Sequence, residues 1–296
     1  MIYSKLYEMI GTFLLEDGIG TNDYYWLNLP SDSVNCTLKF KSKDTILAGL
    51  PYFFAVFDYL LNKTTKKNNL SVNIKDSCES FLELEGSNIN NRNYIEFSLP
   101  FNVALTGERL ALNLLQRASS IATITNRFVQ KAKPYGIAIL ETRKTTPGLR
   151  SLEKYAVRMG GGHNHRFTQV DMFMVKDNHK YFFGGLKKAY QYFKSMNSFY
   201  TPIIVEIHDL QELEEAKILD IKHVMLDNFT PDMVKAALKI KNNSNSTSTM
   251  TYELSGGITL DNIDSYLLEG VDAISIGSLT SNSSCSFADM SLKYKL

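Results

Sequence analysis

The second half of the chain alternates short apolar runs with amphipathic segments, and this alternation constrains the fold more than any other feature. Helical patterns separate most of the runs. Strands that alternate with helices predict a parallel sheet, open or closed. The predicted strands are 137–140, 172–175, 202–205, 223–226, 252–254 and 273–276, and the predicted helices are 149–159, 185–196, 210–219, 231–240 and 260–268. Six strands are fewer than the eight of a complete α/β barrel.

The first half of the chain has a more mixed pattern. A long helix is predicted at its end, because apolar residues recur there at helical spacing. The helices expected in this half are 4–15, 51–61 and 107–133, and the expected strands are 36–40, 70–74 and 94–99.

Composition excludes several classes of protein. A formal net charge of +1 over 296 residues argues against a dedicated nucleic-acid binder. The longest apolar stretch, 46–61, is interrupted by Pro51 and Asp58 and is too short for a membrane span. The start lacks the pattern of a secretion signal, and three scattered cysteines indicate reduced thiols. We therefore expect a cytoplasmic protein without a membrane or nucleic-acid partner.

Polar side chains follow the predicted strands at their carboxyl ends, where parallel α/β folds bind ligands. Several of these side chains are cationic, and arginine forks suit carboxylates and phosphates. The cationic set is Arg143, Lys144, Arg166 and Lys176, with His163 and His165 nearby.

Glu206 and Asp227 are paired carboxylates at adjacent strand ends. They could act as acid and base, or hold a hard divalent cation such as Mg²⁺. Carboxylates beside a cationic cluster suggest a metal-bound polyphosphate. Ser255-Gly256-Gly257, before a helix expected near Thr259, is a plausible phosphate cradle, because glycines allow close approach and a helix start attracts anions.

Four motifs within nearly forty positions are more specific. They are ETRKTTPGLR at 141–150, EKYAV at 153–157, GGGHNHR at 160–166 and KDNH at 176–179. These motifs resemble the quinolinate phosphoribosyltransferases, also called nicotinate-nucleotide pyrophosphorylases (carboxylating). The resemblance continues through MLDN at 225–228, ELSGGIT at 253–259 and ISIG at 274–277, and upstream through LAGL at 47–50 and the 108–123 helix. Only the first forty residues match poorly.

The resemblance implies an α/β fold with an N-terminal α/β sandwich domain and an incomplete six-stranded α/β barrel. The expected domains are 1–115 and 116–284, with the tail 285–296 packing on the first. It further implies a homodimer with shared active sites, or a higher oligomer, in the cytoplasm. The implied enzyme is a pentosyltransferase of NAD biosynthesis, which transfers the 5-phosphoribosyl group of PRPP to quinolinate and releases pyrophosphate and CO2.

The resemblance also assigns roles to residues. The implied catalytic residues are Lys144, Lys176, Glu206 and Asp227. The implied quinolinate-binding residues are Arg109 from the partner subunit, Arg143, Lys144, His165, Arg166 and Lys176. The implied PRPP-binding residues are Lys144, Lys176, Glu206, Asp227, Ser255, Gly256, Gly257 and Gly277. Glu206 and Asp227 are the implied Mg²⁺ ligands, directly or through water.

Three departures from the family pattern leave alternatives open. Ile204 replaces the first of two glutamates on the third strand, segment 16–26 diverges, and 280–282 lacks a histidine that is common there. One alternative is a paralogous phosphoribosyltransferase that acts on another pyridine carboxylate. The other is a non-catalytic anion-binding barrel.

Overall fold

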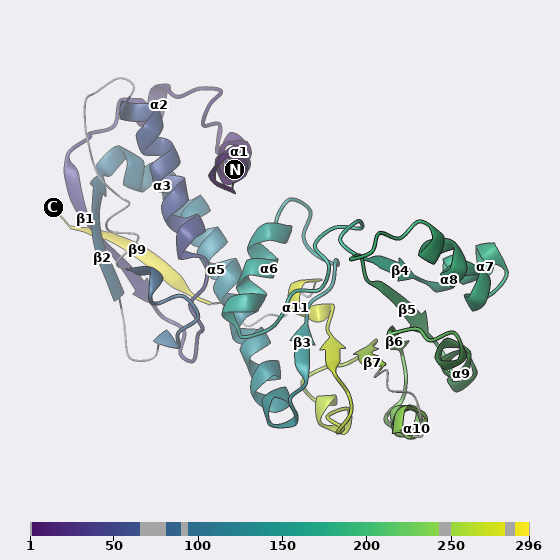
Figure 1. Ribbon diagram of the computed structural model, residues 1–296. Helices are drawn as coiled ribbons and strands as arrows, with labels where there is room; N and C mark the ends of the chain where they lie inside the picture. The colour runs from purple at the N-terminus through teal and green to yellow at the C-terminus, as the bar shows by residue number, and fades with distance from the viewer. Residues whose placement is uncertain (1, 66–80, 90–93, 243–249, 282–287, 296) are drawn as a thin grey trace. The chain divides into compact units, whose positions relative to one another are not determined.

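The computed structural model describes residues 2–65, 81–89, 94–242, 250–281 and 288–295 (Figure 1). The predicted strand 70–74, Cys78 and Cys285 lie outside these residues. The chain divides into two compact units. The first comprises 1–126, 146–161 and 283–296, and the second comprises 127–145 and 162–282.

These units differ in their bounds from the expected domains 1–115 and 116–284. Helix α5 (Phe101–Ala132) continues without interruption past residue 115, and the division falls after Asn126. Helix α6 (Arg150–Met159) belongs to the first unit, because its buried residues join the hydrophobic core of that unit. Those core residues are Leu152, Ala156 and Val157.

The first unit contains a three-stranded antiparallel sheet in the order β2-β1-β9. β1 (Ser33–Phe40) lies in the centre, between β2 (Tyr94–Pro100) and the C-terminal strand β9 (Met290–Lys295). Its other elements are α1 (Ile2–Leu14), the 3-10 turn η1 (Leu15–Asp17), α2 (Tyr24–Leu27) and α3 (Leu50–Thr65). The C-terminal tail therefore pairs with a strand formed near the start of the chain.

Aromatic rings fill the core between α3 and the sheet. Phe53 and Phe57 are fully buried, and their ring centroids lie 5.2 Å apart. Phe97 from β2 meets Phe53 edge to face at 5.9 Å. Burying a phenylalanine side chain stabilises a fold by about 1.5–3 kcal/mol, so this cluster is a major part of what holds α3 to the sheet.

The second unit contains the expected parallel sheet of six strands, in the order β3-β8-β7-β6-β5-β4. From β4 to β8 each strand pairs with the next one in the chain, and β8 pairs with β3. No pairing joins β3 to β4 among the described residues. The α/β fold class is confirmed. The strands are β3 (Ala138–Leu140), β4 (Phe173–Val175), β5 (Ile203–Ile207), β6 (His223–Asp227), β7 (Thr251–Ser255) and β8 (Ala273–Ser275).

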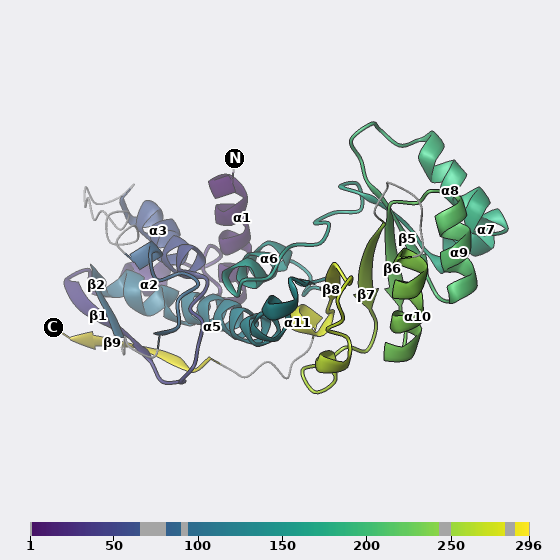
Figure 2. The same cartoon turned by 60° about the horizontal axis from the view of Figure 1, so that its bottom comes forward.

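Helices connect these strands, and Figure 2 shows α8, α9 and α10 along one face of β5–β7. Three of the predicted helices of this unit are confirmed, whereas the short helix after β4 was not expected. The helices are α7 (Asp177–Phe183), α8 (Leu186–Ser195), α9 (Leu210–Ile218), α10 (Pro231–Asn242) and α11 (Ser278–Ser281), with a 3-10 turn η3 (Lys133–Tyr135) after α5.

The predicted helix 260–268 is wrong. Only a 3-10 turn, η4 (Ile263–Ser265), forms there. The side chain of Asn262 accepts a hydrogen bond from the Thr259 backbone N–H at 2.8 Å and donates to the Gly257 carbonyl at 3.0 Å. Asparagine side chains that bond to nearby backbone groups compete with helix formation in this way.

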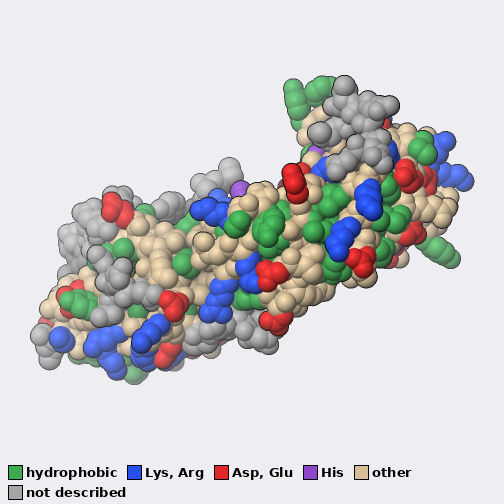
Figure 3. All heavy atoms as spheres, turned by 90° about the horizontal axis from the view of Figure 1, so that it is seen from below, with side chains coloured by type: hydrophobic (Ala, Val, Ile, Leu, Met, Phe, Trp, Pro, Cys, Tyr) green, Lys and Arg blue, Asp and Glu red, His purple; other side chains and the backbone are tan. Residues whose placement is uncertain are grey.

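Basic and acidic side chains are interspersed on the face shown in Figure 3, as the near-zero net charge predicts. Among the described helices, none combines the length and the apolar composition that crossing a membrane requires.

The Glu85 carboxylate joins two parts of the first unit. It accepts hydrogen bonds from the backbone N–H groups of Gly49 and Leu50 at the start of α3, and from the Tyr155 hydroxyl at 2.8 Å. Burial raises the pKa of Glu85, while these three donors lower it. The contact therefore satisfies helix N–H groups that have no partner within the helix.

We predict that Glu85→Ala lowers the free energy of unfolding by about 1–3 kcal/mol, because buried donors lose their acceptor. Urea denaturation measures the change. The matched control Glu83→Ala removes an exposed carboxylate and should change stability by less than about 0.5 kcal/mol. Equal effects of the two variants would contradict the role of Glu85.

Candidate active site

Parallel register brings the polar residues at the strand ends together. Val175 pairs with Val205, so Lys176 lies next to Glu206 one step further along. The Lys176 Nζ and the Glu206 Oε2 are 2.6 Å apart, and the Glu206 side chain is only 7% exposed. A nearly buried carboxylate is thus held by a half-exposed ammonium at the end of the sheet.

The neighbouring strands continue this row. Asp227 pairs with Ser255, and Ser255 pairs with Ser275. Because partners at the same register of a parallel sheet point to the same face, Asp227 and Ser255 lie side by side. The sheet therefore brings together Lys176, Glu206, Asp227 and Ser255 from four successive strands.

The turn after β7 requires glycine. Gly256 has a φ of +97°, and a Cβ atom there would lie 2.1 Å from the Asn228 Oδ1. Gly257 also has a positive φ, of +63°. The expected helix near Thr259 is absent, so any anion at this turn would meet the loop backbone and not a helix N-terminus.

Hydrogen bonds fix the backbone of Lys144, whereas its side chain is exposed. Its N–H donates to the Thr142 Oγ1 at 3.0 Å, and its carbonyl accepts from the buried Thr280 hydroxyl at 2.7 Å. Gly277 lies directly against it, since a Cβ on Gly277 would be 3.3 Å from the Lys144 Cδ. The loops after β3 and β8 therefore fix where the Lys144 side chain starts.

Arg143 and Arg166 are two neighbouring guanidinium groups. Burial lowers the pKa of Arg166, and the charge of Arg143 lowers it further, while Asp171 opposes both effects. The Arg166 Nη1 donates to the Met172 carbonyl at 3.1 Å, and the Arg143 Nε is buried without a hydrogen-bond partner. Within the described parts of the chain, neither arginine forms an ion pair with a carboxylate.

His165 is positioned by two buried acids. The fully buried Glu141 accepts from the His165 backbone N–H at 3.0 Å and from the Asn164 side chain at 2.9 Å. The His165 Nε2 lies 3.5 Å from the Glu253 Oε2. Glu141 thus ties the NHR motif to the end of β3.

Arg109 is the one predicted site residue that belongs to the first unit. It lies on α5 and is exposed. The other predicted residues, Arg143 to Gly277, belong to the second unit. The grouping of Arg109 with them stays a prediction.

Sequence reasoning did not single out His208, Glu253 or Thr280 as site residues. His208 lies close to both Glu206 and Asp227, at 3.7 Å and 3.9 Å. Its position two residues after Glu206 was an available signal, because residues i and i+2 of a strand share a face. Thr280 donates to the Lys144 backbone carbonyl, a kind of contact for which sequence patterns carry no signal.

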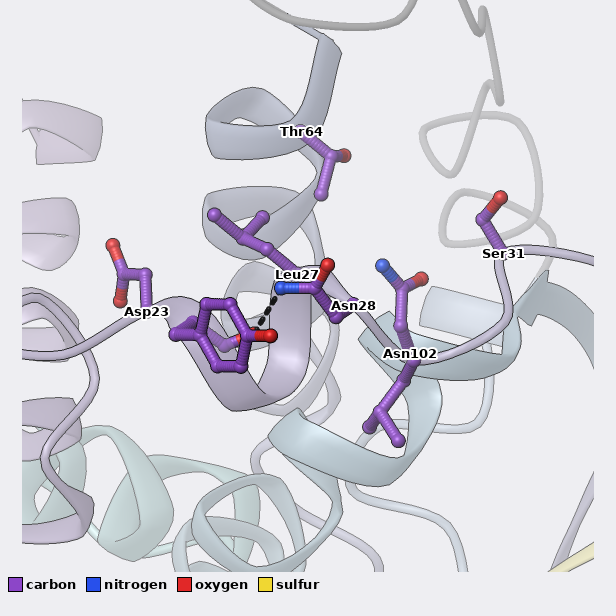
Figure 4. Close-up of a pocket in the computed structure, with 8 residues that line it drawn as sticks. Asp23, Leu27, Asn28, Ser31, Thr64 and Asn102 are labelled. Carbon is purple, nitrogen blue, oxygen red and sulfur yellow. Dashed lines mark hydrogen bonds between the residues drawn. The ribbon is translucent and has the colours of Figure 1, made fainter.

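A separate pocket of about 490 Å³ lies in the first unit (Figure 4). Its lining includes Asp23 and Tyr24 from the divergent segment 16–26, and the Asn28 side chain donates to the Tyr24 carbonyl at 2.6 Å. None of the predicted site residues lines it.

The strand ends thus combine two arginines that lack acidic partners, two lysines, two adjacent carboxylates and a glycine turn. Such a set suits the binding of a dianion next to a metal-bound phosphate ester.

Comparisons with known proteins identify the family. The family model for the C-terminal domain of quinolinate phosphoribosyl transferase matches residues 121–293. Probable nicotinate-nucleotide pyrophosphorylases (carboxylating) of Bacillus subtilis and Methanocaldococcus jannaschii are 36% and 37% identical, covering 95% and 94% of this chain and 91% and 93% of theirs. The nicotinate-nucleotide pyrophosphorylase structure from Francisella tularensis aligns with a TM-score of 0.79 at 30% identity, over 99% of this chain and 97% of that one. The chain belongs to the quinolinate phosphoribosyltransferase family.

We predict that the two arginines bind a dicarboxylate without any other substrate. Phthalate, a benzene ring with two adjacent carboxylates, should bind the wild-type protein, and Arg166→Gln should weaken binding by at least about tenfold, because charge-assisted hydrogen bonds contribute about 1.5–3 kcal/mol. Calorimetric titration measures this. Arg127→Gln, an exposed arginine of the same unit, is the control. Unchanged binding in Arg166→Gln would exclude it from the anion site.

Proposed function

We propose that the protein transfers the 5-phosphoribosyl group of PRPP to quinolinate, forming nicotinate mononucleotide, pyrophosphate and CO2 for NAD biosynthesis. Membership of the family supports this reaction. The observation that carries it is the pair Arg143 and Arg166, which are partly buried beside acidic strand ends and have no carboxylate partner among the residues that the structure describes. Unpaired buried charge is costly, which indicates that a bound anion completes this site.

Quinolinate would lie on the cationic side of the site. Two arginine forks match two carboxylates and fix the ring in its plane. Arg143, Arg166 and Arg109 of the partner subunit would hold the carboxylates, with Lys144, His165 and Lys176 around them. The ring nitrogen would then face the anomeric carbon of PRPP.

PRPP would lie along the ends of β5–β8. The backbone of 255–257 and Gly277 allow phosphate oxygens to approach closely. Glu206 and Asp227 offer carboxylate oxygens that suit Mg²⁺, which neutralises charge on the pyrophosphate leaving group when bound. Lys144 and Lys176 would stabilise the same departing anion, and the two carboxylates would lie near the developing positive charge on the ribose.

The chemistry requires no protein nucleophile. The ring nitrogen attacks the anomeric carbon as the bond to pyrophosphate breaks. The ring nitrogen is then cationic and accepts the electron pair left when the 2-carboxylate departs as CO2. A proton added at that carbon completes nicotinate mononucleotide. The site residues bind, orient and stabilise charge.

The same proposal includes a homodimer in the cytoplasm, with Arg109 entering the site of the other subunit. Large aromatic side chains that are exposed on the second unit support a protein partner, since large exposed apolar surface marks interaction sites. The most exposed of these are Tyr181, Phe182, Phe199 and Tyr200.

We predict that Lys144→Ala and Arg166→Ala each lower kcat/KM at least about a hundredfold, which equals about 2.7 kcal/mol of transition-state stabilisation. The assay follows CO2 and nicotinate mononucleotide from quinolinate, PRPP and Mg²⁺. Lys187→Ala, on the exposed face of α8, is the matched control. Replacing quinolinate with nicotinate should release no CO2. Near-wild-type kinetics in both variants would refute the site.

We predict that inactive Arg109→Ala and Lys144→Ala subunits restore activity when mixed, refolded and reassociated. Half of randomly formed dimers are mixed, and each has one intact site, so about one quarter of wild-type activity should return. Activity that stays at the level of the separate variants would show that Arg109 does not serve the partner's site.

A further inference from the structure

We propose that Glu206, His208 and Asp227 form a binding site for a divalent first-row transition ion, with a nitrogen of His208 as a direct ligand. The inference rests on the proposed function for the role of the ion, and it deepens that function by naming the kind of ion. It concerns a residue that the quinolinate and PRPP assignments leave without a role.

The three side chains converge. One ligand atom from each can be chosen so that all lie within 4.8 Å of one another. The His208 Nε2 is 3.7 Å from the Glu206 Oε1, and the His208 Nδ1 is 3.9 Å from the Asp227 Oδ2. Only one of the two ring nitrogens can bind a given ion, so the bound of 4.8 Å between one ligand atom from each residue is the relevant separation. Ligands at about 2.1 Å from one ion lie up to about 4.2 Å apart, so side-chain shifts of roughly half an ångström or more would bring the three atoms onto a common ion.

Each side chain has the capacity that a ligand needs. Glu206 uses its Oε2 for Lys176, and its Oε1 is the atom that faces the His208 ring. The His208 Nε2 is buried and makes no hydrogen bond. A buried imidazole nitrogen without a partner loses its solvation, and a bound ion would compensate for that loss.

The loop after β5 holds His208 in place. Asp209 caps α9 by accepting from the Glu212 N–H at 2.8 Å. The Glu212 carboxylate accepts from the His208 backbone N–H at 2.9 Å and from the Lys180 Nζ at 2.7 Å. Lys180 also donates to the Glu206 carbonyl at 3.0 Å. The backbone of His208 is therefore fixed before any ion binds, which lowers the cost of ordering the site.

The donor set determines which ion binds best. Two carboxylates alone suit Mg²⁺ or Ca²⁺, which prefer oxygen ligands. An imidazole nitrogen favours transition ions, whose affinity for nitrogen donors rises from Mn²⁺ toward the later metals. The site should therefore bind Mn²⁺ or Co²⁺ more tightly than Mg²⁺, and the preference should depend on His208.

Electron paramagnetic resonance with Mn²⁺ tests the proposal without reference to activity. Titration of the free Mn²⁺ signal gives the affinity, and electron spin echo modulation detects a nitrogen bound to the ion. We expect nitrogen modulation in the wild-type protein. Loss of an outer-shell partner already weakens metal binding about 10- to 100-fold, so His208→Gln should weaken Mn²⁺ binding at least about tenfold and abolish the modulation.

Two further variants sharpen the result. His208→Glu replaces the neutral nitrogen ligand with an anionic oxygen ligand, so this variant should bind Mn²⁺ without nitrogen modulation and lose the preference for Mn²⁺ over Mg²⁺. His223→Gln changes a histidine on β6 whose ring contacts Thr251, and it should leave the spectrum unchanged. Wild-type protein labelled with ¹⁵N-histidine provides a test that depends on no variant, because the modulation frequency must change with the isotope.

Absence of Mn²⁺ binding by the wild-type protein, or binding without nitrogen modulation, would overturn the proposal. Formation of nicotinate mononucleotide with saturating Mg²⁺ is measured separately. Activity without nitrogen ligation would contradict only this inference and leave the proposed function supported. Nitrogen ligation without activity would support the metal site and contradict the proposed function.

Discussion

The register between parallel strands β4 to β7 is the constraint on which the candidate site depends. In three of these strands, a charged residue directly follows a buried apolar residue at the carboxyl end. Val175, Val205 and Leu226 are fully buried, and each is followed directly by a charged residue, which is Lys176, Glu206 or Asp227. Val175 pairs with Val205, whereas Leu226 pairs with Ile207, two residues further along β5. A slip of one residue would turn every side chain to the other face of the sheet and separate the acids from the lysine.

The side chains that pack beneath Lys176, Glu206 and Asp227 are apolar. Met174, Ile204 and Met225 pack together, and the Arg166 Nη2 contacts the Met174 sulfur at 3.7 Å. The family resemblance implies a glutamate at position 204, and Ile204 instead completes the methionine cluster. An apolar floor lowers the local dielectric, so the charges above it interact more strongly with each other and with a bound anion. Ile204 thus changes the packing beneath the site, while the carboxylate of Glu206 is still present.

The strands, three connecting helices of the second unit and its cationic strand ends could be predicted from the sequence. Short apolar runs that alternate with helical patterns predict buried parallel strands, and ligand sites are expected at the carboxyl ends of such strands. The failures have two causes, one local and one that acts over a long separation in the chain. Asn262 uses its side chain to replace the helix expected at 260–268 with a tight turn. β9 depends on pairing with a strand about 250 residues away, which a local pattern cannot reveal.

The candidate site residues that sequence analysis missed are recognised only by their neighbours in three dimensions. His208 acquires its neighbours because β5 and β6 lie side by side, and Thr280 acts on the Lys144 carbonyl across 136 positions of chain. Arg109 differs again, because its proposed role depends on a second copy of the chain. Sequence motifs therefore identified the charged set, while the partners that position it required coordinates.

A crystal structure of the protein with phthalate and Mg-PRPP bound tests the central claim most directly. Phthalate has no ring nitrogen, so the complex cannot react. The account predicts phthalate carboxylates hydrogen-bonded to Arg143 and Arg166, with the pyrophosphate at the ends of β5–β7 beside Glu206 and Asp227. Ligands bound elsewhere, with these arginines turned away from the two carboxylates, would contradict it.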